Sequence, residues 1–142
     1  MRNNQLFLSV LLKTTQRGQV EIRSLLDNAM QPQLRSALEN QLREYESIET
    51  EAFTIALQRG WDLPEMDTPH RFLTDRITRM KLSGRNTDSR IADLLIQMNT
   101  KGMIQGLREL HRFPERDSQI RILSQKLLDC ETANIRQMQT FL

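Results

Sequence analysis

The chain contains few of the residues that most often carry chemistry, form disulfides or break helices. Its 142 residues include one cysteine, two histidines, five glycines and four prolines, and 5% of them are aromatic. Cys130 alone cannot make an internal disulfide, which fits a reducing compartment. The apolar run from Leu6 to Leu12 is too short for a membrane span and lacks the small residues of a signal cleavage site. We therefore expect a cytoplasmic protein without a membrane segment.

The sequence also lacks the short motifs of the common enzyme classes. It has no glycine-rich phosphate loop, zinc-ligand spacing, serine-centred elbow or dinucleotide fingerprint. Its 20 basic and 18 acidic residues are interspersed and give a net charge of +2, as on ordinary solvated helix faces. These absences exclude most enzyme classes, and the charge gives little reason to expect a nucleic-acid partner.

What the chain does contain favours helices. Leu, Arg, Gln, Glu, Ile and Met dominate, and most of them lose little side-chain freedom in a helix. Apolar residues recur at helical spacing in four segments, at about 4–28, 33–59, 88–112 and 115–141. Pro32 suits the first turn of the second segment, and Gly60 suits its end. We expect one all-α domain, 1–142, a four-helix bundle made of two hairpins (about 4–59 and 88–142).

The connector between the hairpins, 60–87, contains a helical pattern from about Pro69 to Leu82 and a basic run. Its only acids between Pro69 and Arg90 are Asp75 and Asp88, so the stretch carries a net charge of +4. The basic residues are Arg71, Arg76, Arg79, Lys81, Arg85 and Arg90. This run could bind an acidic partner, or it could be an ordinary solvated face. It lacks interleaved aromatics for stacking on bases, so we do not expect nucleic acid there.

The two hairpins echo one another. Gly18 and Gly102 are 84 residues apart (102 − 18), and three apolar or acidic positions repeat at 85 (123 − 38). The repeated positions are Leu38, Leu42 and Glu46 in the first hairpin and Leu123, Leu127 and Glu131 in the second. A mid-helix glycine costs about 1 kcal/mol relative to alanine, so we expect a packing reason for each. Tyr45 is a candidate to fill the space over a glycine, and Gly102-x-x-x-Gly106 makes a small groove for close packing, a ligand or a partner.

Carboxylates and amides also repeat. Glu46 and Glu49 lie one turn apart, Glu131 and Asn134 have the same spacing, and the other two helices supply Glu21 and Gln105. This layout resembles the ferritin-like superfamily, whose hairpins supply a Glu from one helix and Glu-x-x-His from the other to two metal ions. The resemblance implies the fold and a candidate iron or manganese site. Its residues would be Glu21, Glu46, Glu49, Glu131, Gln105 and Asn134.

The sequence departs from that family at three of the positions where the family has metal ligands. Gln105 replaces a glutamate, while Glu49 and Asn134 replace histidines. The two histidines, His70 and His111, lie near predicted helix ends. Three interpretations remain: surface glutamates, which the common occurrence of Glu on helix faces favours, a vestigial polar core, or a working metal site. We expect no cofactor under the first two.

A second resemblance is to small uncharacterised helical proteins of spore-forming Firmicutes. It rests on stretches such as Gly18–Ile22, Tyr45-x-x-Ile48 and Cys130-Glu131-x-x-Asn134-Ile135. It implies the fold and no particular activity. Cys130 is expected to be a buried structural thiol, and Trp61 to pack the end of its helix onto the bundle.

Three functions follow as hypotheses. The first is a non-enzymatic structural or protein-interaction bundle, for which a homodimer is one form. The alternatives are a carboxylate metal protein and a binder of anionic partners through the basic connector.

Overall fold

Four long helices make up the part of the chain that the computed structural model describes, residues 2–63, 86–112 and 117–142. They are α1 (Arg2–Leu26), α2 (Pro32–Gln58), α4 (Thr87–Arg112) and α5 (Ser118–Gln139), and no strand occurs in these ranges. The prediction of an all-α four-helix bundle is confirmed. None of these four helices is long and apolar enough to cross a membrane. The helix expected over 69–82 and the basic residues from Arg71 to Arg85 lie outside the described residues.

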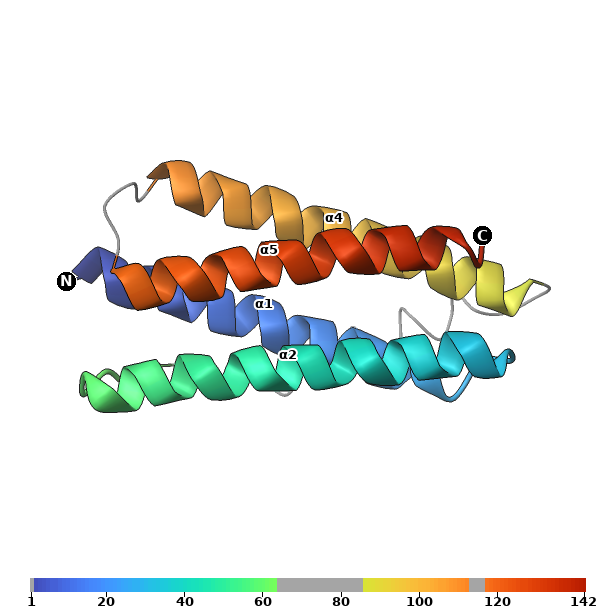
Figure 1. The fold of residues 1–142 in the computed structure, drawn as a ribbon, viewed down its shortest axis with the longest axis horizontal. Helices are drawn as coiled ribbons and strands as arrows, with labels where there is room; N and C mark the ends of the chain where they lie inside the picture. The colour runs from blue at the N-terminus through green and yellow to red at the C-terminus, as the bar shows by residue number, and fades with distance from the viewer. Residues whose placement is uncertain (1, 64–85, 113–116) are drawn as a thin grey trace.

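The helices form two antiparallel hairpins, α1 with α2 and α4 with α5 (Figure 1). Helices α2 and α4 both begin at the end of the bundle where α5 finishes, so Leu63 and Asn86 lie at opposite ends (Figure 1). The second hairpin therefore begins at the opposite end of the bundle from the end of the first, which agrees with the long connector expected from the sequence. This order of helices is that of a bundle with one crossover.

The helix ends follow the local sequence signals. Pro32 occupies the first turn of α2, where its missing N–H costs nothing. Gly60 adopts φ +67 after α2, and the N–H groups of Gly60 and Trp61 donate to the carbonyls of Leu57 and Ala56. These two bonds make a Schellman end, which favours glycine at the left-handed position. Trp61 packs against the core as expected.

The core runs the length of the bundle and is built from the apolar stripes of all four helices. Its fully buried members include large side chains of the predicted apolar stripes, with one tyrosine among them, and also Leu8 and Leu12, which the stripe predicted for the first helix did not contain. The largest of these members are Leu8, Leu12, Ile22, Leu25, Leu34, Leu38, Tyr45, Ile48, Ile91, Leu95, Ile120 and Leu123. Burial is uneven along α4, because its buried residues end at Asn99 and none follows in the turns up to Arg112. The second half of α4 is therefore the least packed part of the described bundle.

Each hairpin is fastened to the other by a side chain near the start of its first helix. Asp88 in α4 accepts hydrogen bonds from the backbone N–H groups of Met30 (2.8 Å) and Gln31 (3.0 Å), where α2 begins. Asn4 in α1 accepts one from the N–H of Asp117 (3.1 Å), where α5 begins. These contacts satisfy backbone donors that a helix start leaves without intrahelical partners. We call the two contacts the reciprocal clamps.

Candidate functional site

The reciprocal clamps show how the two hairpins correspond. Asn4 and Asp88 are 84 residues apart (88 − 4), as are Gly18 and Gly102. The residues they hold, Gln31 and Asp117, are both helix N-caps and are 86 apart (117 − 31). The second helices of the two hairpins are thus related by 86 residues, whereas the sequence suggested 85.

The burial pattern supports this correction of one residue. At 86, buried Ala37 matches buried Leu123, whereas at 85 it would match Ile122, which is 67% exposed. The counterpart of Glu131 is therefore Tyr45, and the predicted pairing of Glu131 with Glu46 is wrong.

Tyr45 packs on Gly18 in the first hairpin. A Cβ at Gly18 would lie 2.8 Å from Cε2 of the Tyr45 ring, so glycine is required for this contact. The Tyr45 hydroxyl donates to Oδ1 of Asn99 at 2.8 Å, and the Asn99 amide donates to the carbonyl of Leu95. The expectation that Tyr45 covers a mid-helix glycine is confirmed, and its polar end is satisfied.

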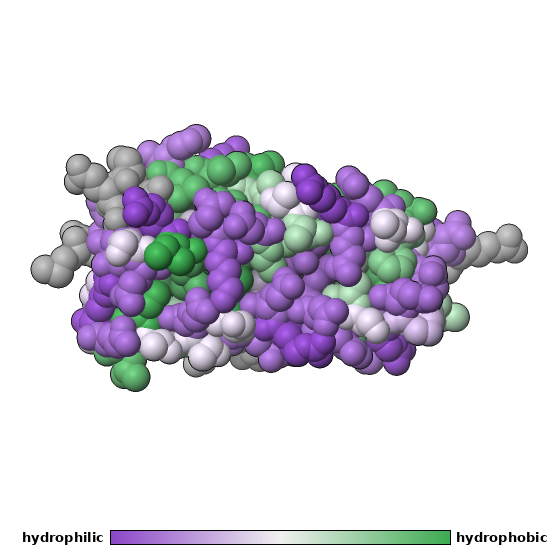
Figure 2. Space-filling view, viewed as in Figure 1, coloured by the Kyte–Doolittle hydropathy of each residue, from purple (hydrophilic) through white to green (hydrophobic). Residues whose placement is uncertain are grey.

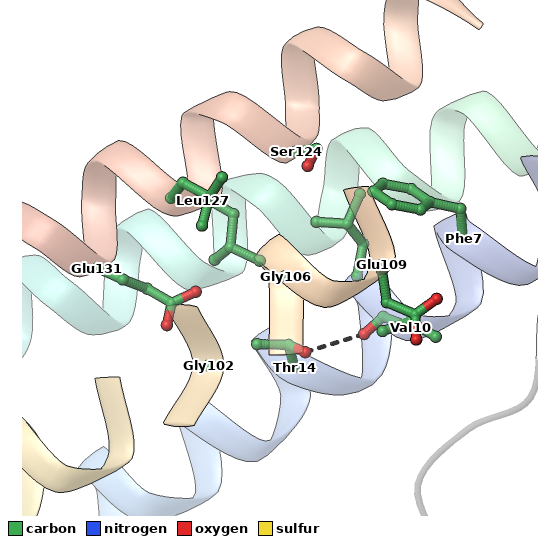
Figure 3. A pocket seen from close by; sticks show the side chains of 11 residues that line it. Phe7, Val10, Thr14, Gly102, Gly106, Glu109, Ser124, Leu127 and Glu131 are labelled. Carbon is green, nitrogen blue, oxygen red and sulfur yellow. Dashed lines mark hydrogen bonds between the residues drawn. The ribbon is translucent and has the colours of Figure 1, made fainter. Parts of the chain in front are cut away.

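Glu131 takes the same place in the second hairpin. A Cβ at Gly102 would overlap Oε2 of Glu131, so the absence of a side chain lets the carboxyl group lie against α4 (Figure 3). Glu131 is only 1% exposed, and its Oε1 has no hydrogen-bond partner among the described residues. Burial without a partner favours the neutral acid and raises the pKa of Glu131 to about 8. A protonated carboxyl group therefore lies in the middle of the bundle at neutral pH.

A small cavity lies beside Glu131, between α1, α4 and α5. Its volume is about 20 Å³, which is enough for a molecule the size of water. In Figure 3, Glu131 lies at one end of the cavity and Phe7 and Glu109 lie at the other. The lining is Phe7, Val10, Leu11, Thr14, Gly102, Gly106, Glu109, Ser124, Leu127, Leu128 and Glu131.

The cavity exists because the second hairpin has smaller or shorter side chains than the first. At corresponding positions Ile22 is replaced by Gly106, and Leu38 by Ser124. Tyr45, Ile22 and Leu38 are buried and fill this region of the first hairpin. The same region of the second hairpin is left partly empty, with a carboxyl group in it.

The six predicted metal ligands do not come together. Glu131 and Asn134 are buried on α5, while Glu46 is 47% exposed and pairs with Arg23 at 3.4 Å. Gln105 is exposed on α4. The remaining two, Glu21 and Glu49, are half-buried. Within the described ranges, no three His, Cys, Asp or Glu side chains form a group that could hold a metal ion.

Cys130, next to Glu131, is half-buried and not fully buried as expected. Its thiol donates to Oε2 of Glu44 at 2.6 Å, and Asn134 approaches the sulfur at 3.7 Å. Burial, followed by the contact with Glu44, raises the pKa of the Cys130 thiol. The protonated thiol is a poor nucleophile and a poor metal ligand at neutral pH.

The sequence did not single out Asn99, Ser124 or Glu109 as site residues. All three are polar residues on the inward-facing side of a helix, and a one-residue shift in the repeat would have aligned Ser124 with Leu38. A small polar residue that aligns with a leucine in a duplicated core indicates that side-chain volume is missing at that position.

No protein-family model, curated protein or solved structure matches this chain. The ferritin-like resemblance therefore rests on the residues quoted above and stays a prediction.

Proposed function

We propose that this chain is a non-enzymatic helical bundle that acts by binding protein, in the first instance a second copy of itself. The surface that would bind lies at the half of the bundle that contains Asn4, Arg59 and Asp117, which we call the amino-terminal end. The observation that carries the proposal is the position of exposed large hydrophobic side chains. Six of the eight in the described part of the chain lie in this half. They are Leu6, Phe53, Leu57, Ile104, Leu107 and Ile122.

The exposed fractions are large for apolar side chains. Leu57 is 83% exposed and Ile122 is 67% exposed, and Phe53 lies one turn before Leu57 on the same side of α2. In Figure 2 the strongly hydrophobic surface is more extensive in this half than in the other. Single exposed apolar residues are ordinary, but a concentration of them at one end of a small protein is typical of a contact surface.

Charged pairs lie beside these apolar residues. Arg59 pairs with Asp117 at 2.6 Å, and Lys126 pairs with Glu51 at 2.7 Å, both between α2 and α5. An apolar centre with a polar rim is the usual composition of a protein interface. This arrangement supports protein binding over a ligand-free structural role.

The test is the mass of the protein in solution as a function of concentration, measured by light scattering and by sedimentation. We expect the parent chain to dimerise as its concentration rises. The double variant Phe53→Glu/Leu57→Glu should remain monomeric, because burying two carboxylates in an apolar contact is costly.

The control is Ser47→Glu, which adds a charge at an exposed position of α2 that is not a helical neighbour of Phe53 or Leu57. It should dimerise like the parent. A parent chain that stays monomeric up to its solubility limit contradicts self-association, and equal behaviour of all three proteins contradicts the role of the Phe53–Leu57 surface.

A further inference from the structure

The cavity beside Glu131 has features that the protein-binding proposal does not use. It combines empty volume with a buried carboxyl group whose Oε1 has no partner in the described part of the chain. An unpaired polar atom inside a protein costs free energy and requires an explanation, of which a bound partner is one. Among the buried unpaired atoms of the described residues, the one on Glu131 lies beside a cavity. The first hairpin shows the alternative, since Tyr45 fills the corresponding space and donates to Asn99.

The polar groups that face the cavity are all oxygens. Two are carboxyl groups, Glu131 and Glu109, and two are hydroxyls, Thr14 and Ser124. The Thr14 hydroxyl already donates to the carbonyl of Val10. No lysine, arginine or histidine lies in the lining. The complementary ligand therefore donates hydrogen bonds and carries positive charge.

The walls and the size of the cavity place two further requirements on the ligand: an apolar part and few atoms. Phe7, Leu11, Leu127 and Leu128 surround the polar groups with apolar surface. The volume of about 20 Å³ admits a group of one or two non-hydrogen atoms. A short alkyl group attached to an ammonium group meets both requirements.

We propose that the cavity between α1, α4 and α5 is a binding site for a small primary amine in its ammonium form, with the ammonium group at Glu131 and its alkyl part between Phe7, Leu127 and Leu128. The ammonium group supplies donors to the carboxylate oxygens. The alkyl group replaces water against the leucines. Binding of the cation displaces the proton of Glu131 to solvent, so charge balances within the site.

The second half of α4 forms one wall and has no buried residue from Thr100 to Arg112. Entry of the ligand past Gly102 and Gly106 therefore requires little repacking. The small size of the ligand limits the affinity, and we expect a dissociation constant on the order of ten millimolar or higher.

The experiment is a titration of the isotopically labelled full chain with methylammonium chloride, followed by the amide resonances of Gly102 and Gly106. All solutions have the same ionic strength, set with potassium chloride. Methylammonium should shift both resonances to saturation. Acetate and methanol should not shift them, because neither carries positive charge. Tetramethylammonium should not shift them either, because it has no N–H donor and is too large.

Three variants connect the binding to the cavity. Glu131→Gln keeps the shape of the side chain and removes its charge, and we expect the affinity to fall by about tenfold or more. Ser124→Val fills the cavity and should abolish binding. Glu39→Gln, which removes an exposed carboxylate on α2, should bind like the parent.

Several results would overturn the proposal. The first is an absence of saturable shifts in the parent. The second is equal shifts with methanol, which would indicate a site for water or any small solute. The third is unchanged affinity in a Glu131→Gln variant whose circular dichroism is native. Unchanged binding in folded Ser124→Val would place the amine elsewhere on the surface. The dimerisation test of the Phe53–Leu57 surface is independent of all of these.

Discussion

Tyr45 and Glu131 occupy corresponding positions and place different demands on the chain. The tyrosine buries a ring and pairs its hydroxyl with Asn99, whereas the glutamate buries a carboxyl group with one oxygen unpaired. Burial also raises the pKa of Tyr45, and the nearby Glu131 adds to this effect, so both groups are protonated at neutral pH. The polar centre of the bundle is therefore uncharged in the empty protein.

The pKa of Glu131 makes the free energy of unfolding depend on pH. Its ordinary value is 4.5 and its value in the folded chain is about 8, so the folded state holds a proton that the unfolded state loses. Between these two values stability falls as pH rises, by up to about 1.4 kcal/mol per pH unit. We expect Glu131→Gln to remove this slope, as measured by urea unfolding at pH 5.5, 6.5 and 7.5.

The ionisable groups around Glu131 are Tyr45 on α2, Cys130 on α5 and, across the cavity, Glu109 on α4. Glu44 on α2 contacts Cys130, and α1 contributes no ionisable residue to the cavity lining. The difference between parent and variant cancels the titration of groups that the substitution leaves unchanged. A difference in unfolding free energy that stays constant from pH 5.5 to 7.5 would contradict a raised pKa for Glu131.

The two mid-helix glycines should respond differently to alanine. At Gly18 the new methyl group meets the rigid ring of Tyr45, and we expect a loss of about 1–3 kcal/mol in unfolding free energy. At Gly102 it meets the end of a flexible glutamate, which can turn away, and helix propensity returns about 1 kcal/mol. Thermal or urea unfolding of Gly18→Ala and Gly102→Ala measures the contrast. Equal losses would mean that Glu131 is as fixed as Tyr45.

At the scale of helices, the reciprocal clamps decide how the hairpins meet. Asp88 binds two backbone N–H groups with one carboxylate, while Asn4 binds one N–H group with an amide oxygen. Hydrogen bonds to a charged acceptor are the stronger kind. The contact made by Asp88 is therefore the stronger of the two reciprocal clamps.

Removal of the stronger clamp should be the more costly. Asp88→Ala leaves the N–H groups of Met30 and Gln31 without this acceptor, and we expect a loss of about 1–3 kcal/mol. Asn4→Ala should cost about 1 kcal/mol. Asp93→Ala, an exposed position on α4, is the control and should be near neutral. The measurement is the midpoint of urea unfolding, and an Asp88→Ala midpoint equal to that of the control would refute the clamp.

The two halves of helix α4 should differ in their rate of local opening, as they differ in burial. The residues up to Asn99 include five buried side chains, and those after it include none. Local opening requires less free energy where few apolar contacts are lost. We expect amide hydrogens of residues 103–112 to exchange much faster than those of 91–99 in native-state hydrogen exchange. Uniform protection along α4 would contradict this expectation.

At the scale of the whole molecule, the sequence determined the helices well and their relative register less well. The apolar period, Pro32 and Gly60 each act locally, so the four segments and their ends could be predicted. The repeat could not be aligned to within one residue, because residue identity favours the wrong spacing. At 85 both Leu123 and Leu127 align with leucines, whereas at 86 only Leu128 does. The position of a glutamate around its helix depends on that register, and this is why Glu46, and not Tyr45, was paired with Glu131.

The clamps also predict how separated hairpins behave. Residues 1–63 and 86–142, prepared as two chains, each lack the side chain that holds the start of their second helix. Each should be weakly helical alone, and a one-to-one mixture should regain the far-ultraviolet circular dichroism of the intact bundle. A hairpin that is fully helical and monomeric by itself would show that the clamps add little.

A homodimer with two-fold symmetry is held by contacts that occur twice, each subunit giving to its partner what it receives. The contacts of Asn4 with Asp117 and of Asp88 with Gln31 have this form within one chain. A single hairpin that carried both parts of the contact would be complementary to another copy of itself. The contact between the two hairpins thus has the form of a dimer interface within one chain. Because the two halves are encoded separately, one half can have Glu131 where the other has Tyr45, which two identical copies could not.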